Sequence, residues 1–295
     1  MVVAGAVDPA PLRAAGWSLR GALSRDPYDA PHGAGLYADA DDVLADPQVD
    51  AVALDGGDAG LAGLLPELRA GGLLVLLPTA APLDPDLVRA ARAVAEPAEA
   101  AVGLLGRWEP WALTVAAALP LVGSLPVQVT VRGWPRGRSA AAELVDLVAA
   151  WCGEVVGAVA APAPLPAEVL PGGASVAWAL LTASGATVLV SHDGGPPEVR
   201  LSFPTARLEA GPAGARWTGG ADLPLLPLPP GVPPAHGSPP GLVATAAALA
   251  AAVGGGDIPT DRWPWPADLG DLLVVARVLE ALRTSARTEQ LVAVA

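Results

Sequence analysis

Two acidic residues three positions apart are the first candidates for chemistry in this sequence. Glu143 and Asp146 lie within residues 140–151, where the apolar spacing predicts a helix. Because residues three apart share one face of a helix, the two carboxyl groups predict a paired-carboxylate site for acid/base catalysis without lysine or histidine. The alternative is a solvated acidic face of that helix.

Other reactive residue types are scarce. All 17 residues counted as Lys or Arg are Arg, which excludes a Schiff-base lysine and a P-loop lysine. The histidines His32, His192 and His236 lie in Gly/Pro-rich loops without the spacing of metal ligands, and the single cysteine, Cys152, can form neither an internal disulfide nor a thiolate cluster. We therefore expect no metal site. His192 follows an expected strand and is a candidate for substrate binding.

The elements that must position these residues are organised around residues 72–84. An apolar run at 73–77 predicts a buried parallel strand, and Pro78 begins the loop after it. Proteins of the α/β class place their chemistry at such strand ends.

The first part of the chain alternates strands with helices. This order predicts right-handed βαβ units and a Rossmann-like, doubly wound parallel sheet within a domain at residues 1–119. The expected strands are 2–7, 19–23, 49–54, 73–77 and 100–105, and the expected helices are 10–15, 39–45, 59–70 and 84–96. Residues 24–35 are expected to form a loop.

The pattern changes after about residue 120, where several strand-like runs follow one another without helices. It predicts a second α/β domain at residues 120–295 with an open, mostly antiparallel sheet. The expected strands are 127–131, 155–160, 175–182, 186–191, 199–203, 207–210 and 291–294, and the expected helices are 140–151, 240–253 and 267–284. Residues 222–240 are proline-rich and predict an extended surface arm.

Composition excludes several classes of partner. A net charge of -13 repels phosphate backbones and argues against nucleic acid. No apolar run reaches the roughly 18 residues of a membrane span, and the N-terminal residues lack a signal-peptide pattern, so we expect a cytoplasmic protein that does not bind membranes. Tryptophans in Gly/Pro-rich segments, such as Trp134 and Trp217, suggest an interface, or else partial burial under loops.

Three segments resemble the glucose-fructose oxidoreductase and inositol dehydrogenase family (Gfo/Idh/MocA). They are YADADDVLADP at 37–47 followed by VDAV at 49–52, GGLLV at 71–75, and RTSART at 283–288 followed by Val292. The resemblance covers nearly the whole chain. It implies an N-terminal NAD(P)-binding domain, a substrate site in the cleft between two domains, and an open C-terminal sheet that often forms dimers. We therefore expect a homo-oligomer or hetero-oligomer through that sheet.

The glycine-rich turn departs from the family pattern. A dinucleotide fold needs glycines after the first strand, so that the backbone can approach the diphosphate. Here Gly5 fits the pattern, Val7 replaces the second glycine, and Asp8 places a carboxylate where a diphosphate would lie. Ser24 or Asp26 at the end of the second strand could still bind an adenosine ribose. NAD(P) is therefore implied by the resemblance but disfavoured by the turn.

The catalytic motifs depart as well. The family's E-K-P lysine corresponds to Thr79, and its H-x-x-D pair corresponds to Glu143 and Asp146, with Glu143 in place of the histidine. Arg107 and Trp108 follow the last strand of the first domain, which in the family faces the substrate. They are candidates for substrate binding, with Arg107 suited to an anionic group or to bridging the domains.

These features lead to three hypotheses. The first is a diverged, lysine-free Gfo/Idh/MocA-like protein that processes a small metabolite, in a role suited to specialised metabolism, with Glu143, Asp146 or Thr79 and an acid/base mechanism free of cofactor. The second is a non-catalytic pseudoenzyme that acts as structural or regulatory partner of an active paralogue. The third is an NAD(P)-dependent imine-type reductase, since thiazolinyl imine reductases are relatives that also lack the lysine.

Overall fold

The structure is a computed structural model that describes residues 1–24, 34–56, 58–78, 84–94, 100–134, 138–160, 178–191, 196–211, 214–218, 240–253 and 267–294. The chain divides into two compact units, each made of two segments. The first unit comprises Met1–Leu105 and Gly231–Leu273, and the second comprises Gly106–Pro230 and Val274–Ala295. The predicted boundary at residue 119 falls inside a helix, α6 (Pro110–Val122). A boundary at a single position also misses the return of the chain to the first unit.

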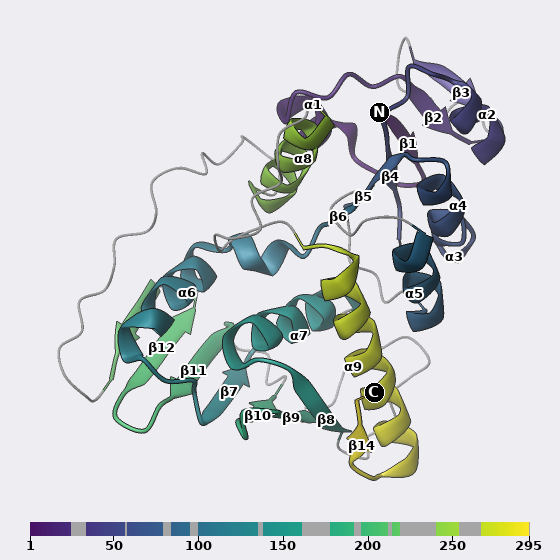
Figure 1. Cartoon of the computed structure of the whole chain (residues 1–295). Helices are drawn as coiled ribbons and strands as arrows, with labels where there is room; N and C mark the ends of the chain where they lie inside the picture. The colour runs from purple at the N-terminus through teal and green to yellow at the C-terminus, as the bar shows by residue number, and fades with distance from the viewer. Residues whose placement is uncertain are drawn as a thin grey trace. The chain divides into compact units, whose positions relative to one another are not determined.

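The first unit contains a six-stranded sheet in the order β3-β2-β1-β4-β5-β6, with all neighbours parallel (Figure 1). This is the strand order of a doubly wound Rossmann sheet, as predicted. The strands are β1 (Val2–Ala4), β2 (Gly21–Leu23), β3 (Gly35–Tyr37), β4 (Ala51–Leu54), β5 (Leu74–Leu77) and β6 (Ala100–Val102). The expectation of a loop reaching residue 35 is wrong at its end, because Gly35 begins the edge strand β3.

Six helices among the described residues accompany this sheet. They are α1 (Pro9–Ala14), α2 (Ala40–Ala45), α3 (Ala59–Ala62), α4 (Leu65–Ala70), α5 (Pro85–Val94) and α8 (Pro240–Val253). The single helix expected at 59–70 is two helices, because glycines weaken its first half and Pro66 fits only the first turn of a new helix. The indole of Trp17 donates a hydrogen bond to the Ala246 carbonyl of α8 at 2.8 Å, which attaches this late helix to the N-terminal core.

The second unit contains an eight-stranded sheet in the order β13-β12-β11-β7-β10-β9-β8-β14. Its one parallel pair is β7 with β10, so the prediction of an open, mostly antiparallel sheet is confirmed. The strands are β7 (Gln128–Arg132), β8 (Val155–Ala160), β9 (Trp178–Thr182), β10 (Thr187–Val190), β11 (Glu198–Ser202), β12 (Arg207–Gly211), β13 (Gly214–Trp217) and β14 (Val292–Ala293).

Helices lie on one side of this sheet. They are α6, α7 (Arg138–Cys152) and the greater part of α9 (Leu269–Thr288), as Figure 1 shows. The buried side chains of β7, Val129 and Val131, alternate with the exposed Gln128 and Arg132, as expected for a sheet covered on one face. None of the described helices is long and apolar enough to cross a membrane.

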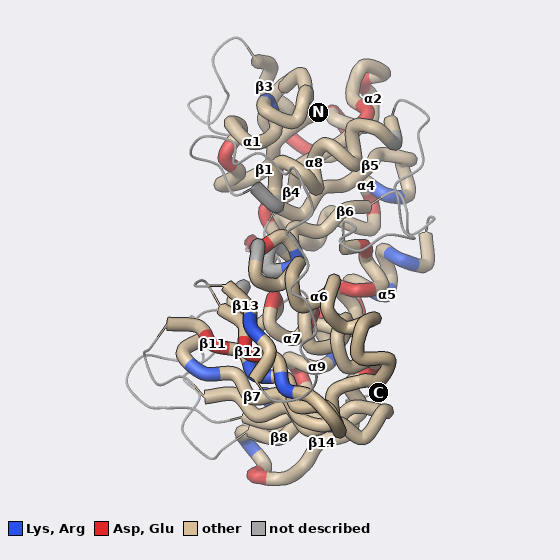
Figure 2. The backbone as a smooth tube through the Cα atoms, turned by 90° about the vertical axis from the view of Figure 1, so that its left-hand side faces the viewer, with Lys and Arg blue, Asp and Glu red and all other residues tan. Residues whose placement is uncertain are grey.

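The face of the sheet that none of the described helices covers has two chemically different halves. Across β11, β12 and β13, Arg200 and Arg216 both pair with Glu209 at 2.8 Å, and Figure 2 shows the charged residues along these strands. Toward β14 the exposed side chains are apolar, among them Leu181 and Leu189. A Cβ on Gly157 would lie within 3.7 Å of both Leu181 and Leu291, so these two leucines flank one spot on β8.

Candidate functional site

Gly5 keeps the backbone geometry that a dinucleotide turn requires. It follows β1 with φ of +81°, a left-handed conformation that favours glycine. A Cβ at this position would lie 2.6 Å from Cδ1 of Leu61 and 2.7 Å from Cβ of Asp55. Only glycine fits here.

In the turn after Gly5, however, several backbone N–H groups already have acceptors within the protein. The Ala6 amide donates to Oδ2 of Asp55 at 3.3 Å, and the Val7 amide donates to the Gly5 carbonyl at 2.9 Å. Asp8 is the N-cap of α1 and accepts from the Ala10 amide at 2.9 Å.

The start of α1 has few free N–H groups that could bind a diphosphate. Its first and third residues, Pro9 and Pro11, have no N–H, and the amide between them is bound by the carboxylate of Asp8. A phosphate at a helix N-terminus needs such N–H donors and an absence of competing negative charge. The residues present therefore do not fit the diphosphate of NAD(P) in the manner of a Rossmann turn.

The predicted cofactor residues lie partly together. Gly5 and Ser24 follow β1 and β2, which pair in parallel with Ala4 opposite Leu23, so both lie at the carboxyl edge of the sheet. At the same edge, Asp58 follows β4 and caps α3 by accepting from the amides of Gly60 at 2.8 Å and Leu61 at 3.1 Å. Three other predicted site residues, Asp26, Thr79 and His192, lie outside the described residues.

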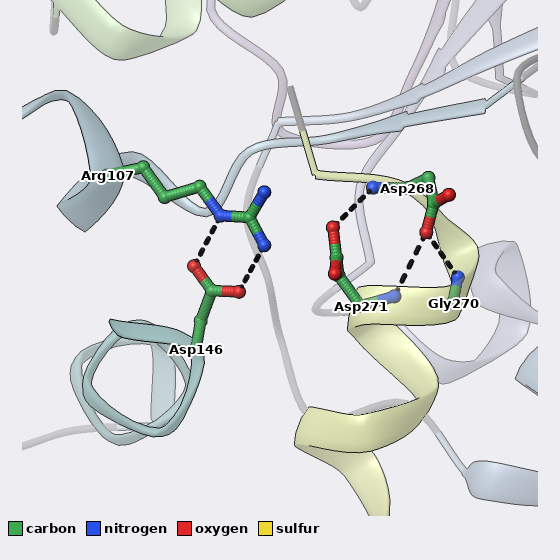
Figure 3. Close-up of polar contacts among 5 residues, drawn as sticks. All are labelled: Arg107, Asp146, Asp268, Gly270 and Asp271. Atoms are coloured by element: carbon green, nitrogen blue, oxygen red, sulfur yellow. Dashed lines mark hydrogen bonds and ion pairs between the residues drawn. The ribbon is translucent and has the colours of Figure 1, made fainter. Parts of the chain in front are cut away.

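In the second unit, the structure brings together Arg107 and Asp146 (Figure 3). Arg107 lies in a 3-10 helix, η3 (Leu105–Trp108), and its Nε and Nη2 donate to the two carboxylate oxygens of Asp146 at 2.6 and 2.5 Å. The side chains are only 2% and 3% exposed. Such a buried bidentate pair sets the guanidinium charge against Asp146 and engages both of its carboxylate oxygens.

Glu143 lies one helical turn before Asp146 in a different environment. Its side chain is partly buried, and this burial, followed by the negative charges of Glu109 and Asp146, raises its pKa to about 7. The two predicted carboxyl groups therefore differ, because Asp146 is bound to an arginine, whereas the pKa of Glu143 is raised to about 7. Only Glu143 has the proton affinity expected of an acid/base group at that pH.

A cluster of tryptophans fixes the helix that carries both acids. Trp111 of α6 makes edge-to-face contacts with Trp134, at a centroid distance of 5.8 Å, and with Trp151 of α7, at 5.9 Å. All three side chains are buried, and Trp134 donates to the Ala140 carbonyl at 2.7 Å. Trp134 is therefore buried rather than part of an exposed interface. Trp108 is partly buried.

Two further acids have a structural role at the start of α9. Asp268 accepts from the amides of Gly270 at 2.6 Å and Asp271 at 3.0 Å, while Asp271 accepts from the Asp268 amide at 3.2 Å (Figure 3). This is a reciprocal capping box. Among the described residues, no group of three His, Cys, Asp or Glu side chains could hold a metal ion.

Sequence reasoning missed three contributors to these sites: Glu109, Asp55 and the prolines of α1. Asp55 follows directly after a predicted strand, and the prolines at 9 and 11 lie in the turn and helix start that follow the first predicted strand, so both signals were available in the sequence. Glu109 has no comparable pattern, since its proximity to Glu143 depends on the packing of α6 and α7.

Comparisons with family models and with curated proteins give no match. Among solved structures, the WlbA dehydrogenase from Bordetella pertussis, solved with NADH and UDP-GlcNAcA, aligns with a TM-score of 0.71 and 14% identity over 100% of this chain and 97% of that chain. A myo-inositol dehydrogenase from Corynebacterium glutamicum gives 0.67 and 15% over 100% and 98%. An oxidoreductase from Agrobacterium radiobacter, solved with NAD+, L-tartaric acid and magnesium, gives 0.69 and 16% over 99% and 97%.

These structures are oxidoreductases of the Gfo/Idh/MocA type, and the predicted resemblance is confirmed at the level of the fold. The chain has their fold, a Rossmann-like parallel sheet combined with an open mixed sheet.

Proposed function

We propose that this chain is a diverged Gfo/Idh/MocA-type protein that transfers protons on a small metabolite through Glu143, without a nicotinamide cofactor. The feature that carries the proposal is the partly buried Glu143 on α7, the helix that corresponds to the catalytic helix of the family, where burial raises the pKa of its carboxyl group to about 7. Isomerisation and elimination are reactions of this class, since both need only a base and an acid.

In the proposed mechanism the Glu143 carboxylate removes a proton from a carbon acid. In an isomerisation the protonated Glu143 returns it to another carbon of the same molecule, and in an elimination it gives the proton to the leaving group as the bond to that group breaks and a carbon–carbon double bond forms. No oxidant or reductant is required. Arg107 neutralises the negative charge of Asp146, and the ion pair holds α7 against η3. Asp146 is therefore a positioning residue in this scheme rather than a second base. Trp108 and His192 remain proposed substrate contacts, and Thr79 remains a proposed catalytic residue.

Independence from NAD(P) is supported by the turn after β1. Pro9, Pro11 and the capped amide of Ala10 leave α1 poorly suited to a diphosphate. The solved relatives that contain NADH or NAD+ suggest the alternative, an NAD(P)-dependent imine-type reductase without the usual lysine. Saturable binding of NADPH would favour that alternative.

A second candidate function is that of a partner protein without catalysis. It is favoured by exposed leucines on the side of the sheet that none of the described helices covers: Leu181, Leu189 and Leu291. These side chains would be buried in a homo-oligomer or in a complex with an active paralogue. Light scattering of the purified protein measures the homo-oligomer. Substitution of Leu181 and Leu189 by serine should then release monomers.

Proton exchange with solvent tests the catalytic proposal across many carbon acids at once, so the substrate need not be identified first. The protein is incubated in D2O with pooled metabolites that contain carbon acids, and deuterium incorporation is followed by mass spectrometry. We expect incorporation into one compound class, unchanged by added NADPH and abolished in Glu143→Gln. The matched control is Glu280→Gln, an exposed acid of α9 that pairs with Arg283. Incorporation by Glu143→Gln at the wild-type rate would refute the role of Glu143.

A further inference from the structure

The carboxyl edge of the parallel sheet contains an unusual arrangement of donors and charges. In a Rossmann turn, the diphosphate is bound by backbone N–H groups between the first strand and the first turn of the following helix. The corresponding segment here runs from Ala6 to Pro11. For five of these six residues, either the backbone N–H has a known hydrogen-bond acceptor or the residue is a proline and has no N–H.

Three of these residues donate their N–H to acceptors within the protein, and two are prolines, which have no N–H. Ala6 donates to Asp55, Val7 to Gly5 and Ala10 to Asp8, at 3.3, 2.9 and 2.9 Å. Pro9 and Pro11 have no N–H. To bind here, a diphosphate would have to replace the existing acceptors of these three N–H groups. It would also find two donors fewer than a helix start normally offers.

Carboxylates occupy the positions where an anionic ligand would accept these bonds. Asp8 and Asp55 bind the turn after β1, and Asp58 binds the first amides of α3. These acids follow β1 and β4, which are neighbours in the sheet with Ala4 opposite Leu54. Their negative charges would oppose a second anion.

The missing second glycine matters less than these features. Val7 has its amide bonded to Gly5 within the turn, and its side chain packs against the core cluster of the first unit. Replacement by glycine would remove this contact without supplying an N–H donor.

We infer that Asp8, Pro9 and Pro11 are the residues that close this edge to diphosphate ligands, and that the absence of glycine at position 7 is secondary. The ligand class excluded is broader than NAD(P): it includes any nucleoside diphosphate that would bind through the turn after β1. This inference rests on the proposed independence from NAD(P) and names the residues responsible for it. It does not depend on the proposed role of Glu143.

The test is direct binding of ADP-ribose, which carries the diphosphate but no nicotinamide, measured by calorimetry. The decisive variant is Asp8→Asn/Pro9→Ala/Pro11→Ala, which restores two donors and removes a charge while Asn keeps a capping oxygen. Val7→Gly is the comparison, and Asp84→Asn/Pro85→Ala at the start of α5 is the matched control, because Asp84 also caps a helix that begins with proline. Thermal unfolding verifies that each variant is folded.

We expect no saturation for the wild type, Val7→Gly and the α5 control at about 1 mM ADP-ribose, and binding at least tenfold tighter in the triple variant. Saturable binding by the wild type or by Val7→Gly would overturn the inference. A folded triple variant without any gain would also overturn it, because another part of the edge would then exclude the ligand. Deuterium exchange by Glu143 is independent of all these outcomes, so failure of the proposed function is distinguishable.

Discussion

Substitution of Arg107 by methionine removes one partner of the buried ion pair and leaves the Asp146 carboxylate, 3% exposed, without its two guanidinium donors. Breaking a buried pair in this way costs about 3–5 kcal/mol, because the attraction that offset the burial of the remaining charge is lost. One kcal/mol corresponds to about 2–4 °C in melting temperature for a domain of 150–250 residues. We therefore expect Arg107→Met to lower the melting temperature by about 10 °C.

The double variant Arg107→Met/Asp146→Leu separates the ion pair from the packing around it. Replacement of both partners by apolar residues of similar volume is often neutral or stabilising. We expect the double variant to regain most of the stability lost in Arg107→Met, and the coupling energy of the cycle to exceed about 2 kcal/mol.

Urea unfolding followed by tryptophan fluorescence is a suitable assay, since Trp111, Trp134 and Trp151 are buried in the same unit. The control is Arg89→Met, which breaks an exposed pair with Asp86 on α5 and should cost less than about 1 kcal/mol. A loss of less than about 1 kcal/mol for Arg107→Met, equal to that of the control, would refute the assignment of Asp146 as a neutralised positioning residue.

Three further predictions concern single residues. The pKa of Glu143 is about 7 in the folded protein against an ordinary value of 4.5, so the folded state binds its proton more tightly, and stability falls as pH rises through this window. Glu143→Gln should abolish that fall and be more stable than the wild type at pH 8 by on the order of 3 kcal/mol, measured as the difference between two urea series. Gly5→Ala should lose about 2 kcal/mol or more, because φ is +81° and the new Cβ would approach two side chains within 2.7 Å; equal melting temperatures would contradict this. Trp134→Phe should lose about 1–2 kcal/mol with the hydrogen bond to Ala140, whereas an unchanged urea midpoint would show that this bond contributes nothing.

The core of the fold was predictable because its strands are sequence-local signals. Fully buried parallel strands such as β4 and β5 appear as continuous apolar runs, and the segment between them, which forms α3 and α4, has periodic leucines. β3 gives no such signal, since two of its three residues are exposed and the first is glycine. The sequence also does not predict α6, whose residues are apolar nearly all round and show no amphipathic period.

The candidate site was predictable only as far as helical spacing extends. The shared face of Glu143 and Asp146 follows from three-residue spacing, and the structure places both on α7. The hydrogen bond from Arg107 to Asp146 joins residues 39 positions apart, so no local pattern contains it. The raised pKa of Glu143 depends first on burial, which is a property of the packed unit and not of the sequence around the residue.

Native mass spectrometry of the freshly purified protein tests the central claim, cofactor independence, most directly. We predict that each subunit carries the mass of its polypeptide, 29.3 kDa, without a nicotinamide nucleotide, and that added NADPH does not change it. A stoichiometric NAD(P) adduct on each subunit would contradict the account and favour the alternative of a nicotinamide-dependent reductase.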